Sequence, residues 1–492
     1  MHDAALGTFR SLRRELEDVV LPLAGSLDGR RFNFQAPIRD LRVALGGYVR
    51  IGSDDAARLG QITSLRVEPQ PGPQIDLALG PDGQVARTEV RFRVARGDGV
   101  LLEPSGAFTD APMEPALPDD VRRRLAEVRF RGAALEIGEL RLAEGVPFAL
   151  DAAGFGRHTF LCGQSGSGKT YSLGLLLERL MLETELRIVV LDPNSDFARM
   201  TETRPGAEPE AAAAWRALAG RIDVRSGGDL RLRIGELEPA TQAALLRLDP
   251  VADGDEYAAY VALVDAERPV DLEAMAGSDE PGAKALHQRA SNLGLLRWPI
   301  WAGDRGGSVI GALADPDARM IVADLGSLGS RDEQAVVAAG VLGELWRRRA
   351  ERRPTLVVID EAHNVCPAEA PDAVTAAAVR DTVAIAAEGR KFGLHLLVST
   401  QRPQKIHENV LTQCENLVLM RLNAAADVAF AQQAFSFVPP ELLGLAASFR
   451  QGEAVVAGTI ASHAALIRFG RRVAQEGGAD VAAGWAGQAP AP

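Results

Sequence analysis

The spacing of hydrophobic residues predicts a short helix at the N-terminus of the chain. Within residues 1–25, one apolar stripe is formed by residues that recur every three or four positions: Leu6, Phe9, Leu12, Leu16 and Val19. A helix turns once in about 3.6 residues, so these side chains share one face. We expect the helix to pack on its own domain, with docking of a partner protein as the alternative.

From about residue 30, the period of the pattern changes to two. Alternating runs cover residues 31–35, 48–51, 75–79 and 88–94, separated by glycine, aspartate and proline. This pattern predicts short antiparallel strands that close into a small β-barrel over residues 26–118. Prolines at positions 112, 115 and 118 indicate a linker at its end.

After residue 145, continuous apolar runs alternate with longer helical stretches, which is typical of an α/β domain with a parallel sheet covered on both faces. The expected strands are residues 158–162, 187–191, 320–323, 355–359, 394–400 and 416–421. More than a hundred residues separate the second strand from the third. That is too long for a simple crossover, so a mainly helical insertion, residues 204–300, divides the core into residues 119–203 and 301–475. The Ala-, Gly- and Pro-rich tail, residues 476–492, is expected to be disordered.

Composition and charge narrow the class of protein. A length of 492 residues, with 47% hydrophobic and 24% charged residues, fits a folded globular protein and excludes a disordered chain. The net charge of −12 argues against a protein that coats nucleic acid over a broad positive surface, so any contact with nucleic acid must be local.

The cysteines and the N-terminus indicate the compartment. Cys162, Cys366 and Cys414 lie far apart and match no metal-ligand spacing, so we expect small core residues in a reducing compartment. No apolar run approaches the length of a membrane span, and the N-terminus carries charges where a signal peptide is apolar. The sequence therefore predicts a cytoplasmic protein that does not enter a membrane.

The clearest chemical signal is a glycine-rich loop between a predicted strand and a predicted helix. It consists of Gly163, Gln164, Ser165, Gly166, Ser167, Gly168, Lys169 and Thr170. Glycines at this spacing let backbone N–H groups surround a phosphate, the lysine reaches the β- and γ-phosphates, and the threonine hydroxyl ligates Mg²⁺. We therefore expect ATP and Mg²⁺ to bind here.

A predicted buried strand ends in two acids, Asp360 and Glu361. This placement predicts Asp360 as a ligand of Mg²⁺ and Glu361 as the residue that orients the attacking water. Residues 360–363 also match the DEAH box of a helicase superfamily whose members carry two tandem ATPase cores. This chain has a single glycine-rich loop and therefore a single ATPase core, which argues against that superfamily. His363 is therefore expected to support the site or the fold rather than to act as a catalytic base.

Other polar residues follow or precede the predicted strands. Gln401 is a candidate sensor of the γ-phosphate. Asp196 is a candidate for ordering water or Mg²⁺, with a turn-forming role for Asp192 and Asn194 as the alternative. Arg390 is the favoured arginine finger, a cation that reaches the ATP of a neighbouring subunit. Lys391 and Arg402 are the alternatives for that role, and a plain surface charge without such a role is the third alternative.

Five motifs occur in a fixed order, namely GQSGSGKT, LDPNSDF, LVVIDEAHN, EGRKFG and STQRP. Together with the barrel segments at residues 46–51 and 60–63, they resemble the HerA-like branch of the HerA/FtsK P-loop translocases. The resemblance implies a RecA-like ATPase core that forms a homo-oligomer, a hexameric ring, with ATP between subunits and double-stranded DNA in the channel. It also implies a nuclease partner in DNA-end resection, or an effector partner in antiphage defence.

The resemblance places Lys169 and Thr170 in the Walker A motif, Asp360 and Glu361 in the Walker B motif, and Arg390 at the finger position. Our leading prediction is a Mg²⁺-dependent ATPase that translocates or unwinds double-stranded DNA. One alternative is a nucleotide-gated ring that serves as a scaffold for a nuclease or effector. A less favoured alternative is a secretion or conjugation motor.

Overall fold

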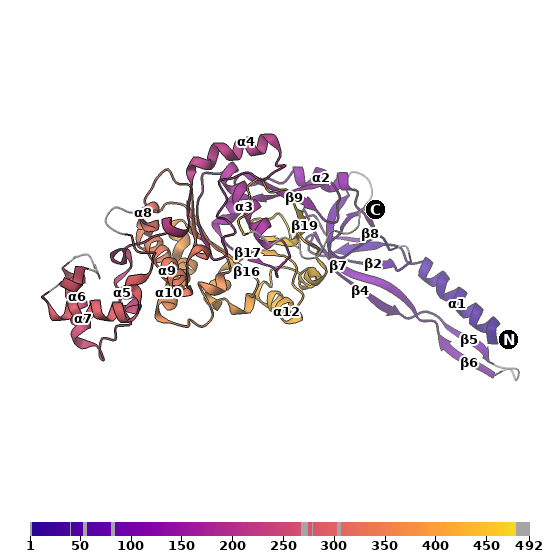
Figure 1. The fold of residues 1–492 in the computed structure, drawn as a ribbon. Helices are drawn as coiled ribbons and strands as arrows, with labels where there is room; N and C mark the ends of the chain where they lie inside the picture. The colour runs from indigo at the N-terminus through magenta and orange to yellow at the C-terminus, as the bar shows by residue number, and fades with distance from the viewer. Residues whose placement is uncertain are drawn as a thin grey trace, which may run out of the picture.

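The computed structural model describes residues 2–39, 41–52, 57–79, 84–266, 274–277, 279–302 and 307–478. The tail that we expect to be disordered lies outside these residues from position 479 onward. Along the described chain, helix α1 (His2–Asp18) precedes a β-barrel, and an α/β domain follows the barrel (Figure 1).

Six strands close into the barrel, in the order β1 (Leu23–Ser26), β2 (Arg31–Pro37), β7 (Phe92–Leu101), β4 (Arg58–Gln70), β3 (Tyr48–Ile51) and β8 (Phe108–Pro115). The predicted proline linker is wrong, because Pro112 and Pro115 lie within β8 and Pro118 begins helix α2 (Pro118–Ala126). Pro112 lacks an N–H group, but its carbonyl oxygen accepts a hydrogen bond from the Gly52 N–H at 2.8 Å, so pairing with the region after β3 continues.

Two barrel strands, β4 and β7, lead into a separate two-stranded sheet of β5 (Gln74–Leu79) and β6 (Gln84–Glu89). The run at residues 75–79 therefore lies outside the barrel, contrary to our prediction. Helix α1 packs against β5 and β7, so it packs on its own domain, as expected. Figure 1 shows α1 and the β5–β6 ribbon projecting together, away from the α/β domain.

The α/β domain is built on an 11-stranded sheet. Its order is β10 (Pro147–Asp151), β9 (Ala134–Leu140), β19 (Ala465–Phe469), β18 (Glu453–Gly458), β17 (Cys414–Leu419), β11 (His158–Cys162), β16 (Leu394–Thr400), β15 (Thr355–Ile359), β12 (Arg187–Asp192), β14 (Met320–Asp324) and β13 (Ile222–Arg225). The strands from β17 to β13 are parallel, which confirms a large α/β sheet. The strands from β10 to β18 pair antiparallel, contrary to an all-parallel sheet.

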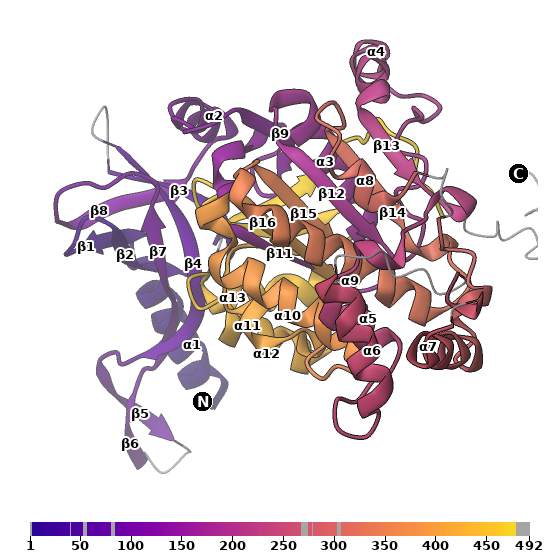
Figure 2. The ribbon, with the colours of Figure 1, turned by 90° about the vertical axis from the view of Figure 1, so that its left-hand side faces the viewer.

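Helices cover both faces of this sheet (Figure 2). One face carries α2, α3 (Lys169–Glu183) and α4 (Pro209–Leu218). The other carries α5 (Pro239–Leu245), α6 (Gly254–Asp265), α7 (Pro281–Asn292), α8 (Val309–Ala312), α9 (Arg331–Arg347), α10 (Ala373–Glu388), α11 (Glu408–Leu411), α12 (Ala425–Ala434) and α13 (Pro440–Gly444). The segment expected to be mainly helical contains α4 to α7, but its strand β13 joins the edge of the sheet.

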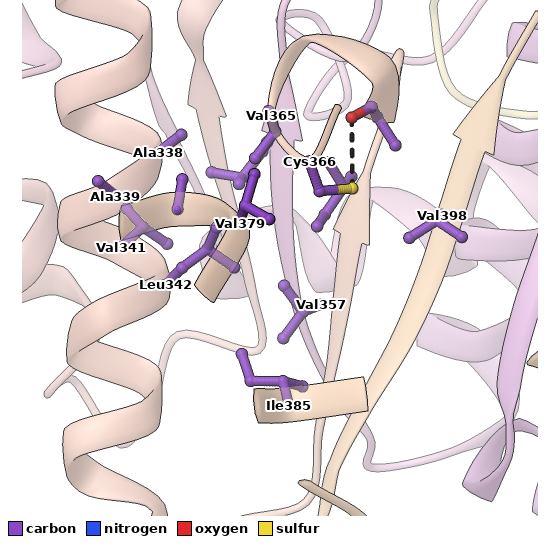
Figure 3. Close-up of a cluster of buried hydrophobic side chains, with 14 of the residues drawn as sticks. Ala338, Ala339, Val341, Leu342, Val357, Val365, Cys366, Val379, Ile385 and Val398 are labelled. Carbon is purple, nitrogen blue, oxygen red and sulfur yellow. Dashed lines mark hydrogen bonds between the residues drawn. The ribbon is translucent and has the colours of Figure 1, made fainter. Parts of the chain in front are cut away.

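A hydrophobic core lies between the sheet and the helices α9 and α10. Leu342 and Ile385 come from these helices, and Val357 and Val398 come from β15 and β16 (Figure 3). Cys366 lies in the same core, where its Sγ–H donates a hydrogen bond to the Ala362 carbonyl oxygen at 3.3 Å. All three cysteines are buried and free, which confirms the prediction of small core residues. This packing fixes the parallel strands, whose carboxyl ends meet at one edge and carry the polar motifs.

Candidate nucleotide-binding site

The glycine-rich loop joins β11 to α3, as predicted. Gly166 and Gly168 adopt φ angles of +73° and +91°, which favour glycine. A Cβ at Gly163 would lie 2.6 Å from the Ser167 Oγ atom, so this position also requires glycine. The Ser167 N–H donates to the Gln164 carbonyl oxygen at 3.1 Å, and its own carbonyl oxygen accepts from the Gly452 N–H at 2.8 Å. The loop is therefore held in a tight turn directly before the first residues of α3.

Lys169, the first residue of α3, crosses to the neighbouring strands. Its Nζ atom lies 2.6 Å from Asp360 Oδ1 and 3.0 Å from Glu361 Oε1. It also donates to Ser399 Oγ at 3.1 Å. Burial lowers the pKa of Lys169, but the charges of Asp360 and Glu361 outweigh burial and raise the pKa to about 12. The predicted Walker A lysine and both Walker B acids are thus brought together, with the lysine charged.

Glu361 follows β15 in a left-handed backbone conformation, with φ +41°. Such a conformation is unfavourable for a residue with a Cβ, and it is typical of functional sites. His363 Nδ1 lies 3.3 Å from Glu361 Oε2 and 3.1 Å from Thr400 Oγ1. Burial raises the pKa of Glu361, but the hydrogen bond from His363 and the charge of Lys169 outweigh burial. Together they lower the pKa of Glu361 to about 2. Glu361 is therefore ionised at neutral pH, and His363 supports it rather than acting alone.

Three carboxylates form a compact cluster beside the lysine. The oxygens of Asp192, Asp196 and Asp360 lie within 4.8 Å of one another. Asp196 Oδ2 accepts a hydrogen bond from Thr170 Oγ1 at 3.3 Å. Burial, together with the charge of Asp360, raises the pKa of Asp196 to about 6. Burial also raises the pKa of Asp192, to about 7, with contributions from the charges of Asp360 and Asp196. The hydrogen bonds that Asp192 accepts from the Phe197 and Asp196 N–H groups lower its pKa, but burial and the two charges outweigh them.

This cluster fits a hard divalent cation. Mg²⁺ is bound in proteins by carboxylate and hydroxyl oxygens, and a cation would relieve the repulsion that raises these pKa values. Among the described residues, Asp360 Oδ2 is buried without a hydrogen-bond partner, so one ligand atom is available. Asp196 was one of our sequence candidates, whereas Asp192 was considered only as a turn-forming residue. The hydrogen bonds from the Asp196 and Phe197 N–H groups to Asp192 show that it also orders the loop.

Some residues of the site were missed in the sequence. Ser399, inside β16, donates to Asp360 Oδ1 at 2.7 Å. Arg421 donates from Nη2 to the Gly166 carbonyl oxygen at 3.0 Å, from the chain that follows β17. The first contact depends on β16 lying beside β15, and the second depends on β17 lying beside β11. Serine within a strand and arginine after one carry no signal of their own.

Two predicted residues do not meet the others. Gln401 follows β16 at the same edge and is half-buried, but within the described residues no hydrogen bond or ion pair joins it to Lys169 or Glu361. Arg390 precedes β16 and therefore lies at the opposite edge of the parallel sheet. It pairs with Glu415 at 3.0 Å, and its side chain is 43% exposed. Arg390 is accordingly absent from the nucleotide site of its own chain.

The two alternatives for the finger lie in different places. Lys391 shares the 3₁₀ turn Gly389–Phe392 with Arg390, and its side chain is 73% exposed. Arg402 follows Gln401 at the edge that carries the glycine-rich loop, and it is exposed. Its backbone N–H donates to Thr400 Oγ1 at 3.0 Å. Exposure alone therefore does not separate the three cations.

Comparisons with known proteins bear on the class of protein to which this chain is similar. The sequence model of the family "Helicase HerA, central domain" matches residues 135–286. A probable helicase of Methanocaldococcus jannaschii is 23% identical over 78% of this chain and 80% of its own length. The DNA double-strand break repair helicase HerA of Sulfolobus acidocaldarius is 21% identical over 91% of this chain and 93% of its own length.

Among solved structures, VirB4 of Thermoanaerobacter pseudethanolicus is similar in fold, with a TM-score of 0.51 and 16% sequence identity. The match covers 70% of this chain and 98% of the VirB4 chain. The described helices include none with the length and apolar character needed to cross a bilayer.

The fold and the glycine-rich loop with its paired acids define a P-loop NTPase, an enzyme that hydrolyses ATP. Within that class the chain is similar to the HerA helicases, and this similarity confirms the resemblance drawn from the ordered motifs.

Proposed function

We propose that this protein is a Mg²⁺-dependent ATPase that assembles into a hexameric ring and translocates or unwinds double-stranded DNA. The observation that carries the proposal is that the nucleotide-site residues and the predicted arginine finger lie at opposite ends of the parallel strands. Lys169, Asp360 and Glu361 form a compact group at one edge, whereas Arg390 is exposed at the other. A finger at Arg390 acts only if a second copy presents it, so the complete site requires a ring or stack of subunits.

The residues of the site suggest how hydrolysis proceeds. Lys169 transfers its hydrogen bonds from the two acids to the β- and γ-phosphates when ATP enters. This transfer frees Glu361, still held by His363, to accept a proton from the attacking water. Thr170 and Asp360, with Asp196 beside them, are the residues that would hold Mg²⁺, which neutralises charge on the phosphate oxygens. Gln401 remains a candidate sensor because it follows Thr400, the partner of His363.

DNA as the substrate is supported by the curated relative that is named as a DNA repair helicase. A net charge of −12 is compatible with it, because a ring repeats a few phosphate contacts in every subunit. We assign the barrel, residues 26–118, to the docking of partners, and the core, residues 119–203 and 301–475, to the motor. A nuclease or an effector is the kind of partner we propose.

Replacing Arg390 by alanine tests the trans arrangement. We expect ATP to bind normally and kcat to fall by about 10³-fold or more, the range found for arginine fingers. Glu415 keeps its ion pair with Arg157 at 2.6 Å, so the variant should fold. Lys391→Ala and Arg402→Ala test the two alternatives, and both should keep near-wild-type kcat if Arg390 is the finger.

Mixing Arg390→Ala with Lys169→Ala subunits makes this test specific. At equal amounts, about a quarter of the interfaces combine an intact loop with an intact finger, so activity should exceed that of either variant alone. Absence of rescue at every ratio, with mixed oligomers shown to form, would contradict a finger that acts in trans.

A second candidate function is a nucleotide-gated scaffold for a nuclease or effector. It is favoured by the projecting ribbon and helix α1, which lie far from the nucleotide site (Figure 1). Val19 and Val85 are 75% and 63% exposed there.

Deleting residues 1–18 tests the docking role of α1 while leaving β1 intact. On the scaffold proposal, the deletion should abolish capture of the nuclease partner in a pull-down and leave basal ATPase activity unchanged. Capture at the full-length level would contradict a docking role for α1.

A further inference from the structure

A buried ion pair joins the end of the described chain to the helix of the glycine-rich loop. Arg472 and Glu178 have side chains that are 0% and 1% exposed, and Arg472 Nε donates to Glu178 Oε1 at 3.0 Å. Glu178 lies on α3, the helix that begins with Lys169. Gly174 on the same helix makes room for the arginine, because a Cβ there would lie 2.3 Å from the guanidinium carbon.

The backbone next to Arg472 completes this anchor. The N–H groups of Val473 and Ala474 donate to the two oxygens of Glu178 at 2.7 Å and 2.8 Å. The Arg472 N–H donates to the hydroxyl of Tyr171, which directly follows Thr170, at 2.7 Å. A buried charge with this many partners fixes the position of the segment relative to α3.

Beyond the anchor, the chain runs antiparallel to the loop at residues 195–204. Ala474 pairs with Thr203 in an isolated bridge, and the Gln475 N–H donates to the Glu202 carbonyl oxygen at 2.8 Å. The Gly477 N–H donates to the carbonyl oxygen of Asp196 at 2.9 Å. We name residues 472–478 the strap. It connects the helix of the glycine-rich loop with the loop that carries Asp196.

The last two residues of the strap fit closely against the acidic loop. A Cβ at Gly477 would lie 1.7 Å from the carbonyl oxygen of Ser195, which itself has φ +62°. A Cβ at Gly478 would lie 3.0 Å from Asp196 Oδ1. Only small residues allow this approach, so the position of Asp196 depends on the strap.

We infer that the strap is a positioning element for the divalent cation, with Arg472 as its anchor and Gly477 and Gly478 as its contacts with the Asp196 loop. This inference rests on the proposed Mg²⁺ site. The strap is anchored on α3, which begins directly after the glycine-rich loop, and its other end holds Asp196 next to Thr170. The strap therefore fixes the distance between the glycine-rich loop and the residues that would bind the cation. Residues that orient a metal ligand in this way typically change metal affinity by about 10- to 100-fold when they are altered.

The test compares three glycine-to-alanine variants of the full chain. Gly477→Ala and Gly478→Ala disturb the contact with the Asp196 loop. Gly470→Ala is the matched control, because its Cβ would meet Gly138 at an ordinary 3.5 Å. The first readout is the dissociation constant of Mn²⁺, which electron paramagnetic resonance measures in the presence of a saturating non-hydrolysable ATP analogue. The second is the rate of tryptic cleavage after Arg199 or Arg204, inside the loop.

We expect Gly477→Ala to weaken Mn²⁺ binding by about 10-fold or more and to speed cleavage in the loop, while affinity for the ATP analogue stays the same. Gly478→Ala should show the same change in Mn²⁺ binding to a smaller extent, and Gly470→Ala should match the wild type. If Gly477→Ala does not fold, Gly478→Ala decides the question through Mn²⁺ binding.

Wild-type Mn²⁺ binding and wild-type cleavage in the folded variants would overturn the inference. A wild-type protein that binds Mn²⁺ with the ATP analogue but does not hydrolyse ATP would instead contradict the proposed function. Because neither readout depends on turnover, the two failures are distinguishable.

Discussion

Replacing Glu361 by glutamine is expected to lower kcat for ATP hydrolysis by about 100-fold or more, the usual loss when a general base is removed. Glutamine keeps the shape of the side chain and the contact with His363, but it cannot accept a proton. Lys169 retains its pair with Asp360 at 2.6 Å, so ATP should still bind. The measurement is steady-state ATPase activity together with the affinity for a fluorescent ATP analogue.

The variant should accumulate in its ATP-bound form, which makes it suitable for trapping the assembled ring. Glu369→Gln, an exposed glutamate in the same segment, is the control and should match the wild type. Near-normal turnover in Glu361→Gln would assign the orientation of water to another group, of which Asp196 is the nearest candidate.

Replacing Lys169 by alanine is expected to weaken ATP binding by about 10- to 150-fold, because one charge-assisted interaction with the phosphates is lost. The change also leaves Asp360 and Glu361 buried without their cation. Removing one partner from a buried ion pair typically destabilises a protein by about 3 to 5 kcal/mol. We therefore expect a lower unfolding temperature in the absence of nucleotide, measured by calorimetry beside an ATP titration.

Lys169→Met separates the two effects, since methionine restores the packing of the aliphatic stem but not the charge. Loss of ATP affinity in both variants would support the contact with phosphate. Wild-type affinity in a folded Lys169→Met variant would contradict it.

The nucleotide site was largely predictable because its signals are local. Gly166 and Gly168 stand at fixed offsets from Lys169, and the acids Asp360 and Glu361 directly follow a buried strand. The contacts of Ser399 and Arg421 were not predictable, since they depend on β16 lying beside β15 and on β17 lying beside β11. The amino-acid sequence indicates that the carboxyl ends of the parallel strands meet at one edge of the sheet, but it does not indicate which strands are neighbours there.

The fold was predictable where the pattern has one interpretation. The buried runs of β11, β12, β15 and β16 are continuous and apolar, and they were placed within one residue of the observed strands. The run in β18 looks the same, yet this strand pairs antiparallel with β17, because apolar periodicity carries no direction. Pro112 and Pro115 were misinterpreted, since proline is tolerated in β8 where its missing N–H is not needed.

The strap was beyond sequence analysis for a different reason. Arg472 is one arginine among many, and nothing in its neighbours indicates full burial. Its partner Glu178 is almost 300 positions away in the sequence and exposed on any isolated helix. Only the packed structure shows that the two charges meet beneath the nucleotide site.

The most direct test of the proposed motor is the steady-state ATPase activity of the purified protein with and without linear double-stranded DNA, at two salt concentrations, with Glu361→Gln as the blank. We expect DNA to stimulate hydrolysis, and we expect the stimulation to be weaker at the higher salt concentration, because phosphate contacts release counterions. Hydrolysis that is unaffected by DNA, or that appears only with a co-purified partner, would contradict the motor and favour the gated scaffold.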